Sequence, residues 1–295
     1  MVIETQNITG WPPVHGPDEW TGIGKNGVPH PSPAPPRVSV VIPTLNEAKN
    51  LPHVFARIPH DVHEVIIVDG HSTDGTVDVA RSLWPNVRVV AQLGRGKGNA
   101  LRHGFAACRG DIIVMLDADG SADGGEIPRF VAALRAGADF AKGTRFAHGG
   151  GSSDITRIRR LGNWGLNTIV NVLFGTRYTD LCYGYNAFWA HCLPHMNIDC
   201  DGFEVETLIN IRISKARLRV TEVPSFEGPR IHGASNLRAG RDGWRVLQTI
   251  LRERRRAAVE ASPTKRMVNL DQELSVASLV IEFEAEPRLT ASSNG

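Results

Sequence analysis

Two aspartates, Asp117 and Asp119, follow the most hydrophobic run of the sequence, in the stretch DIIVMLDAD. On an extended backbone, side chains two residues apart leave the same face of a strand, so both carboxylates would point the same way. Paired carboxylates can hold a hard divalent cation, which in turn can neutralise a diphosphate. The alternative is a pair of solvated acids in a turn, but the position after a buried strand favours a metal site.

A third carboxylate, Asp69, ends another apolar run, EVIIVDG, and Gly70 follows it. An aspartate in this position can accept a hydrogen bond from a nucleobase N–H, and a glycine lets a ligand approach the backbone. The same two residues could instead begin an ordinary turn. The residues by themselves favour neither interpretation.

The stretch GRGKGNALRHG, residues 94–104, has the glycine content of a phosphate-binding loop. It matches neither the Walker A pattern nor the dinucleotide-binding pattern, because the required glycines and the Ser or Thr after Lys97 are absent. A glycine-rich loop that enters a helix can still present Lys97 to an anion. A tight turn is the structural alternative.

The elements that would position these residues alternate along the chain. Short β-branched runs at 38–43, 64–70, 87–91 and 111–119 are separated by stretches with helical spacing at 46–58, 73–84 and 98–109. This alternation predicts an α/β fold with a mostly parallel sheet covered by helices on both faces. Ligands bind beyond the carboxyl ends of such strands, where Asn46, Asp69 and Asp117 stand.

A second region, from about 140 to 258, is predicted to hold a helix at 157–174, a strand at 186–190, a helix with Glu204 and Glu206, a strand at 219–226 and a basic helix at 236–258. Residues 1–36 contain eight of the 18 prolines, which predicts a disordered arm. Residues 259–295 show weak periodicity and are interpreted as a tail.

Composition excludes several classes of protein. Thirty-three Lys and Arg against 31 Asp and Glu argue against a general nucleic-acid binder. The sequence contains no run of eighteen apolar residues, so it predicts no membrane-spanning helix. No secretory signal is visible either. The four cysteines lack CxxC pairs, which favours reduced thiols in a cytoplasmic protein.

Taken together, several ordered blocks between residues 38 and 256 resemble one family, the inverting family 2 glycosyltransferases with a GT-A fold. The blocks are VSVVIPTLNEAKNL, VIIVDGHSTDGT, GRGKGNALRHG, VMLDADGS, KGTRF, TDLCYGYNAFW, GFEVETLI and VTEVPSFEGPRIHGASNLRAGRDGWRVL. The branch they resemble most is that of the dolichol- or polyprenyl-phosphate mannosyl- and glucosyltransferases. The resemblance implies a GT-A domain over 37–258, with a nucleotide-binding half at about 37–145 and an acceptor half at about 146–258.

The resemblance also implies site residues. Asp119 would bind Mg²⁺ or Mn²⁺, Asp117 would contact the ribose or the metal-bound diphosphate, and Asp69 would read the base. Ser121 stands where many lipid-phosphate members carry a glutamine metal ligand. The other implied donor residues are Pro43, Asn46, Glu47, Gly70, Lys97 and Ala118; Arg145 would lie near the diphosphate or sugar, and Arg230, Gly233 and Ser235 would lie on the acceptor or diphosphate side.

The activity implied by the resemblance is metal-dependent transfer of a sugar from a nucleotide-diphosphate sugar, GDP-mannose ahead of UDP-glucose, to a polyprenyl phosphate. One alternative is a tailoring enzyme that glycosylates a soluble hydroxyl, for which Asp201 or Glu204 could be the base. Another, of a different class, is a nucleotide-sugar-binding module without turnover.

The basic stretch from Arg230 to Arg256 has eight arginines against Asp242 and Glu253. It predicts either a helix packed on the core with a solvated basic face or a contact with an anionic acceptor or lipid headgroups. We therefore expect a cytoplasmic enzyme that can be peripheral at the inner membrane face.

Overall fold

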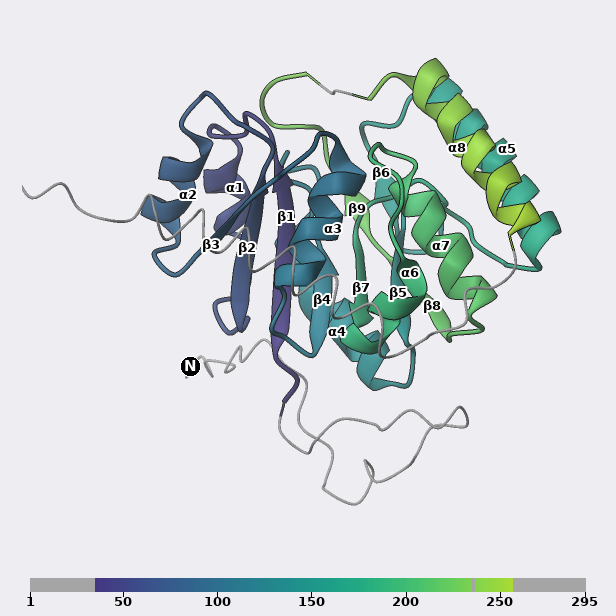
Figure 1. Cartoon of the computed structure of the whole chain (residues 1–295), viewed down its shortest axis with the longest axis horizontal. Helices are drawn as coiled ribbons and strands as arrows, with labels where there is room; N and C mark the ends of the chain where they lie inside the picture. The colour runs from purple at the N-terminus through teal and green to yellow at the C-terminus, as the bar shows by residue number, and fades with distance from the viewer. Residues whose placement is uncertain (1–34, 235–236, 257–295) are drawn as a thin grey trace, which may run out of the picture. The chain divides into compact units, whose positions relative to one another are not determined.

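The part of the chain described by the structure, residues 35–234 and 237–256 of a computed structural model, contains one seven-stranded sheet in the order β3-β2-β1-β4-β7-β5-β8 (Figure 1). The strands are β1 (Val38–Thr44), β2 (Glu64–Asp69), β3 (Arg88–Ala91), β4 (Ile112–Met115), β5 (Phe140–Thr144), β7 (Asn186–Trp189) and β8 (Val220–Pro224). Neighbours pair in parallel except β7, which is antiparallel to β4 and β5. This arrangement confirms the predicted α/β class.

Helices cover both faces of the sheet, because side chains of the buried strands alternate between two cores. On one face, Val40 and Ile42 pack with α1 (Leu51–Phe55), α2 (Thr76–Leu83) and α4 (Ile127–Arg135). On the other face, Val41 packs with α3 (Lys97–Ala107), α6 (Leu193–Met196) and α7 (Val205–Lys215). Both faces are therefore buried, as the apolar strands predicted.

Two further helices, α5 (Arg157–Phe174) and α8 (Ala239–Arg255), lie side by side beyond α7 (Figure 1). A small core of Val170, Ile211, Val246 and Ile250 joins these three helices. The bounds of α5 match the prediction, and α8 lies within the predicted basic stretch. Shorter elements complete the fold: β6 (Gly151–Ser152) pairs with β9 (Phe226–Glu227), and 3₁₀ turns occur at Gly124–Glu126 and Ala190–Cys192.

Three predicted elements differ from the structure. The strand predicted at 111–119 ends at Met115, and the chain then turns through Gly120, whose φ is +75°. Asp117 and Asp119 therefore lie in a turn, and the expectation that they share one face of an extended strand is wrong. The helix predicted at 46–58 shortens to α1, because residues 47–50 form a hydrogen-bonded turn before it. The strand predicted at 219–226 divides into β8 and β9 after Pro224.

Other predictions fall outside the described residues. These are residues 1–34 of the arm predicted over 1–36, Ser235, and the tail predicted over 259–295. All described residues belong to one compact unit of the chain.

Candidate active site

The carboxyl ends of the parallel strands gather most of the predicted site residues at one edge of the sheet. Lys97, the first residue of α3, lies at this edge with its ammonium between two carboxylates. Its Nζ lies 2.5 Å from Oδ1 of Asp117 and 2.7 Å from Oε1 of Glu206 on α7. Burial alone would lower the pKa of Lys97, but the two carboxylates outweigh it and raise that pKa. Burial raises the pKa of Glu206, and Lys97 opposes this only in part.

A second cation, Arg230, is shared in the same way. Its guanidinium donates to both carboxylate oxygens of Glu47, at 3.0 and 3.2 Å, and lies 3.5 Å from Oδ2 of Asp119. The segment that carries it is fixed beside the Asp117–Asp119 turn, because the Ile231 N–H donates to the Asp119 carbonyl and His232 exchanges hydrogen bonds with Asn50. A residue 111 positions away from Asp119 is thereby brought to the same site.

These two groups leave the edge with an excess of negative charge. Lys97 and Arg230 supply two positive charges, while Asp117, Glu206, Glu47 and Asp119 supply four carboxylates when ionised. A divalent cation would offset that difference, and carboxylate oxygens are ligands that Mg²⁺ and Mn²⁺ accept. The residues present therefore fit a divalent metal.

The metal would also need oxygens from elsewhere. Among residues 35–234 and 237–256, no group of three or more His, Cys, Asp or Glu side chains is arranged to hold a metal ion. Ser121 does not add a ligand of its own here; its N–H and its hydroxyl both donate to Oδ1 of Asp119. Asp117 and Asp119 would thus need water or diphosphate oxygens to complete the coordination.

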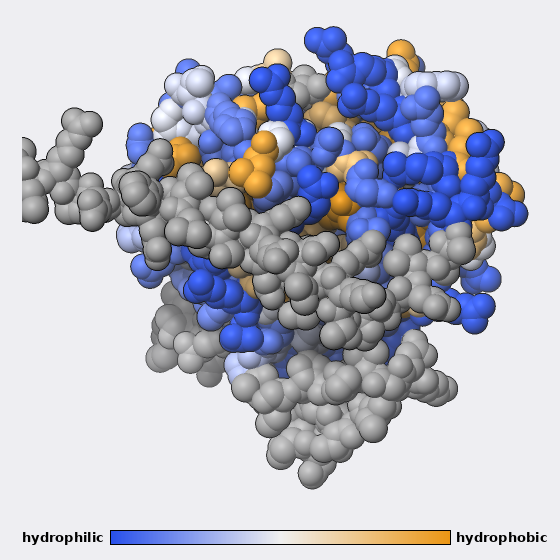
Figure 2. Space-filling model, viewed as in Figure 1, coloured by the Kyte–Doolittle hydropathy of each residue, from blue (hydrophilic) through white to orange (hydrophobic). Residues whose placement is uncertain are grey.

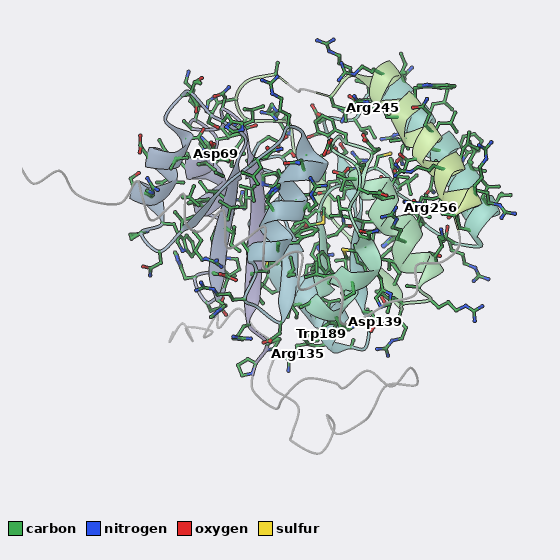
Figure 3. The ribbon with its side chains drawn as sticks, in the orientation of Figure 1. Asp69, Arg135, Asp139, Trp189, Arg245 and Arg256 are labelled. Atoms are coloured by element: carbon green, nitrogen blue, oxygen red, sulfur yellow. The ribbon has the colours of Figure 1, made fainter. Side chains whose placement is uncertain are left out.

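Asp69 lies at the same edge, at the end of β2 (Figure 3). Its Oδ2 accepts the backbone N–H groups of His71 and Ser72, whereas its Oδ1 is buried and has no hydrogen-bond partner among the described residues. A buried acceptor without a partner is costly unless a ligand supplies a donor. Asn46, with φ at +57°, joins this loop to the β1 turn by accepting the Thr73 N–H.

Arg145, which follows β5, is buried and paired with acidic residues of the protein. Its Nε and Nη2 donate to Asp180, its Nη1 donates to Glu227, and the side chain is 4% exposed. All three guanidinium nitrogens therefore donate to carboxylates of the protein, and the group stacks over the Tyr183 ring at 4.9 Å. Arg145 thereby ties β5 to the segment that carries Arg230, and its contact with diphosphate or sugar stays a prediction.

The remaining predicted residues are divided between the edge and its surroundings. Gly70 is tightly packed, since a Cβ there would lie 2.9 Å from Oε1 of Gln92. Asp201 contributes its backbone carbonyl, which accepts the Gly98 N–H at the start of α3, and its side chain is exposed. Glu204 precedes α7, with Oε2 buried and without a partner in the described part of the chain. Pro43 lies in β1, Ala118 is buried in the turn, and Gly233 is exposed with φ at +80°.

Sequence reasoning missed Glu206 and Gly184. Glu206 was noted only as part of a helix, yet its side chain is 5% exposed and faces Lys97. A Cβ at Gly184 would lie 2.7 Å from Nζ of Lys97 and 3.0 Å from Oδ2 of Asp117. The sequence signal for Glu206 was a single acidic residue among the apolar residues of α7, which usually requires a partner.

A pocket of about 620 Å³ lies at the start of α5. Its lining residues are Phe146, Ile155, Arg157, Arg160, Leu161, Asn163, Trp164 and Thr179. Thr179 connects it with the carboxyl edge, since its hydroxyl is 2.6 Å from that of Thr144 at the end of β5. The Asn163 side chain is buried, and its Nδ2 has no hydrogen-bond partner among the described residues.

Comparison of this chain with known proteins identifies a matching family and several similar proteins. Residues 39–192 match the family model described as glycosyl transferase family 2. The chain is similar to the undecaprenyl-phosphate mannosyltransferase of Micrococcus luteus, with 32% identity over 72% of this chain and 91% of that protein. It is also similar to the polyprenol monophosphomannose synthase of Mycolicibacterium smegmatis, with 32% identity over 68% of this chain and 81% of that protein.

Among solved structures, the chain is similar to glucosyl-3-phosphoglycerate synthase from Mycobacterium tuberculosis in complex with Mn²⁺, UDP and glucosyl-3-phosphoglycerate. The identity is 26%, the TM-score is 0.58, and the match covers 74% of this chain and 80% of that one.

Proposed function

The chain belongs to glycosyl transferase family 2, and from this membership we propose that it transfers a hexose, with inversion, from a nucleotide-diphosphate sugar to a polyprenyl phosphate. GDP-mannose is the first proposed donor, because similar proteins are named as mannosyltransferases of polyprenyl phosphates. UDP-glucose is the second, because a solved relative holds UDP and a glucosylated product.

The donor would bind at the carboxyl edge. Asp69 would accept the base N–H with its unpartnered Oδ1, and Pro43, Asn46, Glu47, Gly70 and Ala118 would line the nucleotide pocket around it. Asp117 and Asp119 would hold Mg²⁺ or Mn²⁺, which stabilises a leaving diphosphate electrostatically. Among the described residues, Lys97 and Arg230 are paired with these carboxylates.

The observation that carries the choice of acceptor is the pocket at the start of α5. Leu161, Trp164 and Phe146 supply apolar walls, and Arg157 and Arg160 supply positive charge. The buried Nδ2 of Asn163 adds a hydrogen-bond donor without a partner among the described residues. Apolar walls with cations and a free donor suit an anion that carries a hydrocarbon chain, and a polyprenyl phosphate is such a molecule.

A phosphate acceptor also fits the residues that the edge offers for chemistry. A phosphate monoester has its second pKa near ~6 and is largely a dianion at neutral pH, so its oxygen can attack the anomeric carbon without a protein base. The protein then only has to place it opposite the leaving diphosphate. Arginines, Arg230 among them, serve that purpose by charge and hydrogen bonding.

The outer face of α5 and α8 suits contact with a membrane surface that contains such an acceptor. Ile158, Leu161, Trp164 and Val172 of α5 are exposed, as are Trp244 and Leu251 of α8. Figure 2 shows hydrophobic residues among strongly hydrophilic ones on this part of the surface. Exposed Trp and aliphatic side chains beside arginines are typical of interfacial helices. We propose peripheral contact at the inner face of the membrane.

No helix in the described ranges combines the length and apolar character needed to cross a bilayer.

A soluble acceptor is the second candidate function. The solved relative of M. tuberculosis carries a glucosylated phosphoglycerate, which is a small anionic product. If the acceptor is a hydroxyl, a carboxylate must take its proton, and the unpartnered Oε2 of Glu204 is the available group near the start of α7.

Release of nucleotide tests the donor and metal first. The purified protein is incubated with Mn²⁺ or Mg²⁺ and each nucleotide sugar, and GDP or UDP is measured. We expect slow metal-dependent hydrolysis of one donor, accelerated by polyprenyl phosphate in detergent. No acceleration by polyprenyl phosphates together with acceleration by 3-phosphoglycerate or an alcohol would contradict the lipid acceptor.

A variant pair tests the pocket. Leu161→Glu places a negative charge in the pocket, so the KM for a short-chain polyprenyl phosphate in detergent should rise while donor hydrolysis is unchanged. Val172→Glu is the matched control, since Val172 is exposed on the same helix but does not line the pocket. Equal acceptor KM values for the two variants would contradict acceptor binding at this pocket.

A further inference from the structure

The ammonium of Lys97 contacts two carboxylates, one that faces the site and one that is buried. Asp117 is 37% exposed, whereas Glu206 is 5% exposed. The two contacts are of similar length, 2.5 and 2.7 Å, so Lys97 is in direct contact with both carboxylates. Asp117, the proposed metal ligand, thus competes for the Lys97 ammonium with Glu206, which is buried.

We infer that Glu206 is a positioning residue that determines how readily Asp117 exchanges Lys97 for a divalent cation. This inference rests on the proposed function, because it takes Asp117 as a metal ligand. When a cation binds Asp117, the contact with Lys97 must weaken, since the two positive charges repel each other. The ammonium, 11% exposed, would then be a buried unpaired charge unless another carboxylate holds it.

Glu206 provides that second carboxylate without any movement of Lys97. If Glu206 lost its charge, Lys97 would have Asp117 as its remaining carboxylate partner in the described structure and would release it only at the cost of an unpaired buried charge. Cation binding would therefore weaken. Glu206 acts on the metal site through Lys97 and need not contact the metal.

Gly184 lies beside the group formed by Lys97, Asp117 and Glu206. A Cβ at Gly184 would lie 2.7 Å from Nζ of Lys97, 3.0 Å from Oδ2 of Asp117 and 3.3 Å from Oε1 of Glu206. A side chain at this position would displace the ammonium from between its two partners. The absence of a side chain at Gly184 thus leaves the room that the Lys97 ammonium occupies between its two partners.

Binding of Mn²⁺ in the presence of GDP or UDP, measured by titration calorimetry without turnover, tests the inference in four proteins: wild type, Glu206→Gln, Lys97→Met and the double variant. We expect Glu206→Gln to weaken Mn²⁺ binding on the order of tenfold in the wild-type background, from the loss of a charged hydrogen-bonded partner. In the Lys97→Met background, the same change should cost clearly less, because no ammonium remains to compete for Asp117.

Glu64→Gln is the matched control. Glu64 is also buried and paired with a single cation, Arg88 at 2.5 Å, but it lies at the amino end of β2. This change should leave Mn²⁺ affinity unaltered. If Glu206→Gln does not fold, as judged by its thermal transition, Glu206→Asp withdraws the carboxylate by one methylene and should weaken Mn²⁺ binding in the same direction.

The outcomes separate the inference from the proposed function. No nucleotide-dependent Mn²⁺ binding by the wild type would overturn both. Normal binding by the wild type, with equal costs of Glu206→Gln in both backgrounds or with Mn²⁺ affinity unchanged in Glu206→Asp, would overturn the role of Glu206 and leave the glycosyltransferase proposal intact.

Discussion

Carboxylates are paired with cations differently at the two edges of the sheet, which lie at the amino and carboxyl ends of its parallel strands. At the amino edge, where Asp139 and Trp189 lie in Figure 3, three carboxylates are each paired with a different arginine. The pairs are Asp111 with Arg37, Asp139 with Arg219, and Glu64 with Arg88. At the carboxyl edge, four carboxylates share two cations.

The pKa values follow this division. Burial alone would raise the pKa of Asp139, but hydrogen bonds from His191 and Arg219 outweigh it and lower that pKa. Hydrogen bonds from Arg37 lower the pKa of Asp111. At the carboxyl edge, burial raises the pKa of Glu206 because Lys97 compensates only in part. One edge is satisfied within the chain, and the other fits a ligand that brings positive charge.

The largest expected effect is at the carboxyl edge. Asp119→Asn should reduce sugar transfer on the order of 10²–10³-fold, because it removes a proposed metal ligand and with it the electrostatic stabilisation of the leaving group. Folding should be little changed, since Asp119 lies in a turn and not in the core. Turnover at saturating Mn²⁺ and the thermal transition check this together. Near-normal turnover of the variant would contradict the proposed role of Asp119 as a metal ligand.

The matching change at the amino edge should lower the stability of the protein and leave its activity unchanged. Asp139→Asn removes the charge that accepts hydrogen bonds from Arg219 and its backbone N–H, so the free energy of unfolding should fall by roughly 1.5–3 kcal/mol. Activity per folded molecule should stay the same. Denaturant unfolding and active-site titration measure the two quantities, and a loss of turnover without a loss of stability would break the comparison.

The sequence predicted the sheet better than the contacts at its edges. Apolar runs and their spacing gave the first four strands within a few residues, because burial on both faces leaves a continuous signal in the chain. The pairing of Arg145 with Asp180 and Glu227 left no such signal, since it joins residues 35 and 82 positions apart. Glu206 does stand out as the single acidic residue of α7, but its partner Lys97 is 109 positions away, so the sequence could not pair the two.

Acid should destabilise the folded protein through the carboxylates of the amino edge. The pKa values of Asp139, Asp111 and Glu64 are lowered in the folded protein, so the unfolded chain binds protons more readily as the pH falls. Their contribution to stability is complete above the unfolded pKa values, near about 4, and is lost as the pH falls toward the folded values. Melting temperatures between pH 7 and pH 3 should decline below about pH 4.5. Asp139→Asn should make that decline shallower, and a parallel decline would exclude Asp139 from it.

The smallest expected effect concerns Asp69, a carboxylate of the carboxyl edge that has hydrogen-bond partners for only one of its oxygens among the described residues. Its Oδ2 caps the turn after β2, and its buried Oδ1 has no partner among the described residues. A base contact made by Oδ1 would be equally strong in the ground state and in the transition state. Its loss should therefore raise the donor KM about tenfold, the worth of one hydrogen bond to a charged group, with little change in kcat.

Two substitutions distinguish this binding role from the cap. Asp69→Ala removes both oxygens, whereas Asp69→Asn keeps an oxygen for the His71 and Ser72 N–H groups and turns an amide donor toward the base. If Oδ1 accepts the base N–H, both variants should raise the donor KM, because a donor facing a donor cannot replace the bond. If Asp69 only caps the turn, Asp69→Asn should restore the wild-type KM. A collapse of kcat at constant KM would instead give Asp69 a part in the chemical step, and the two oxygens would then have to be assigned anew.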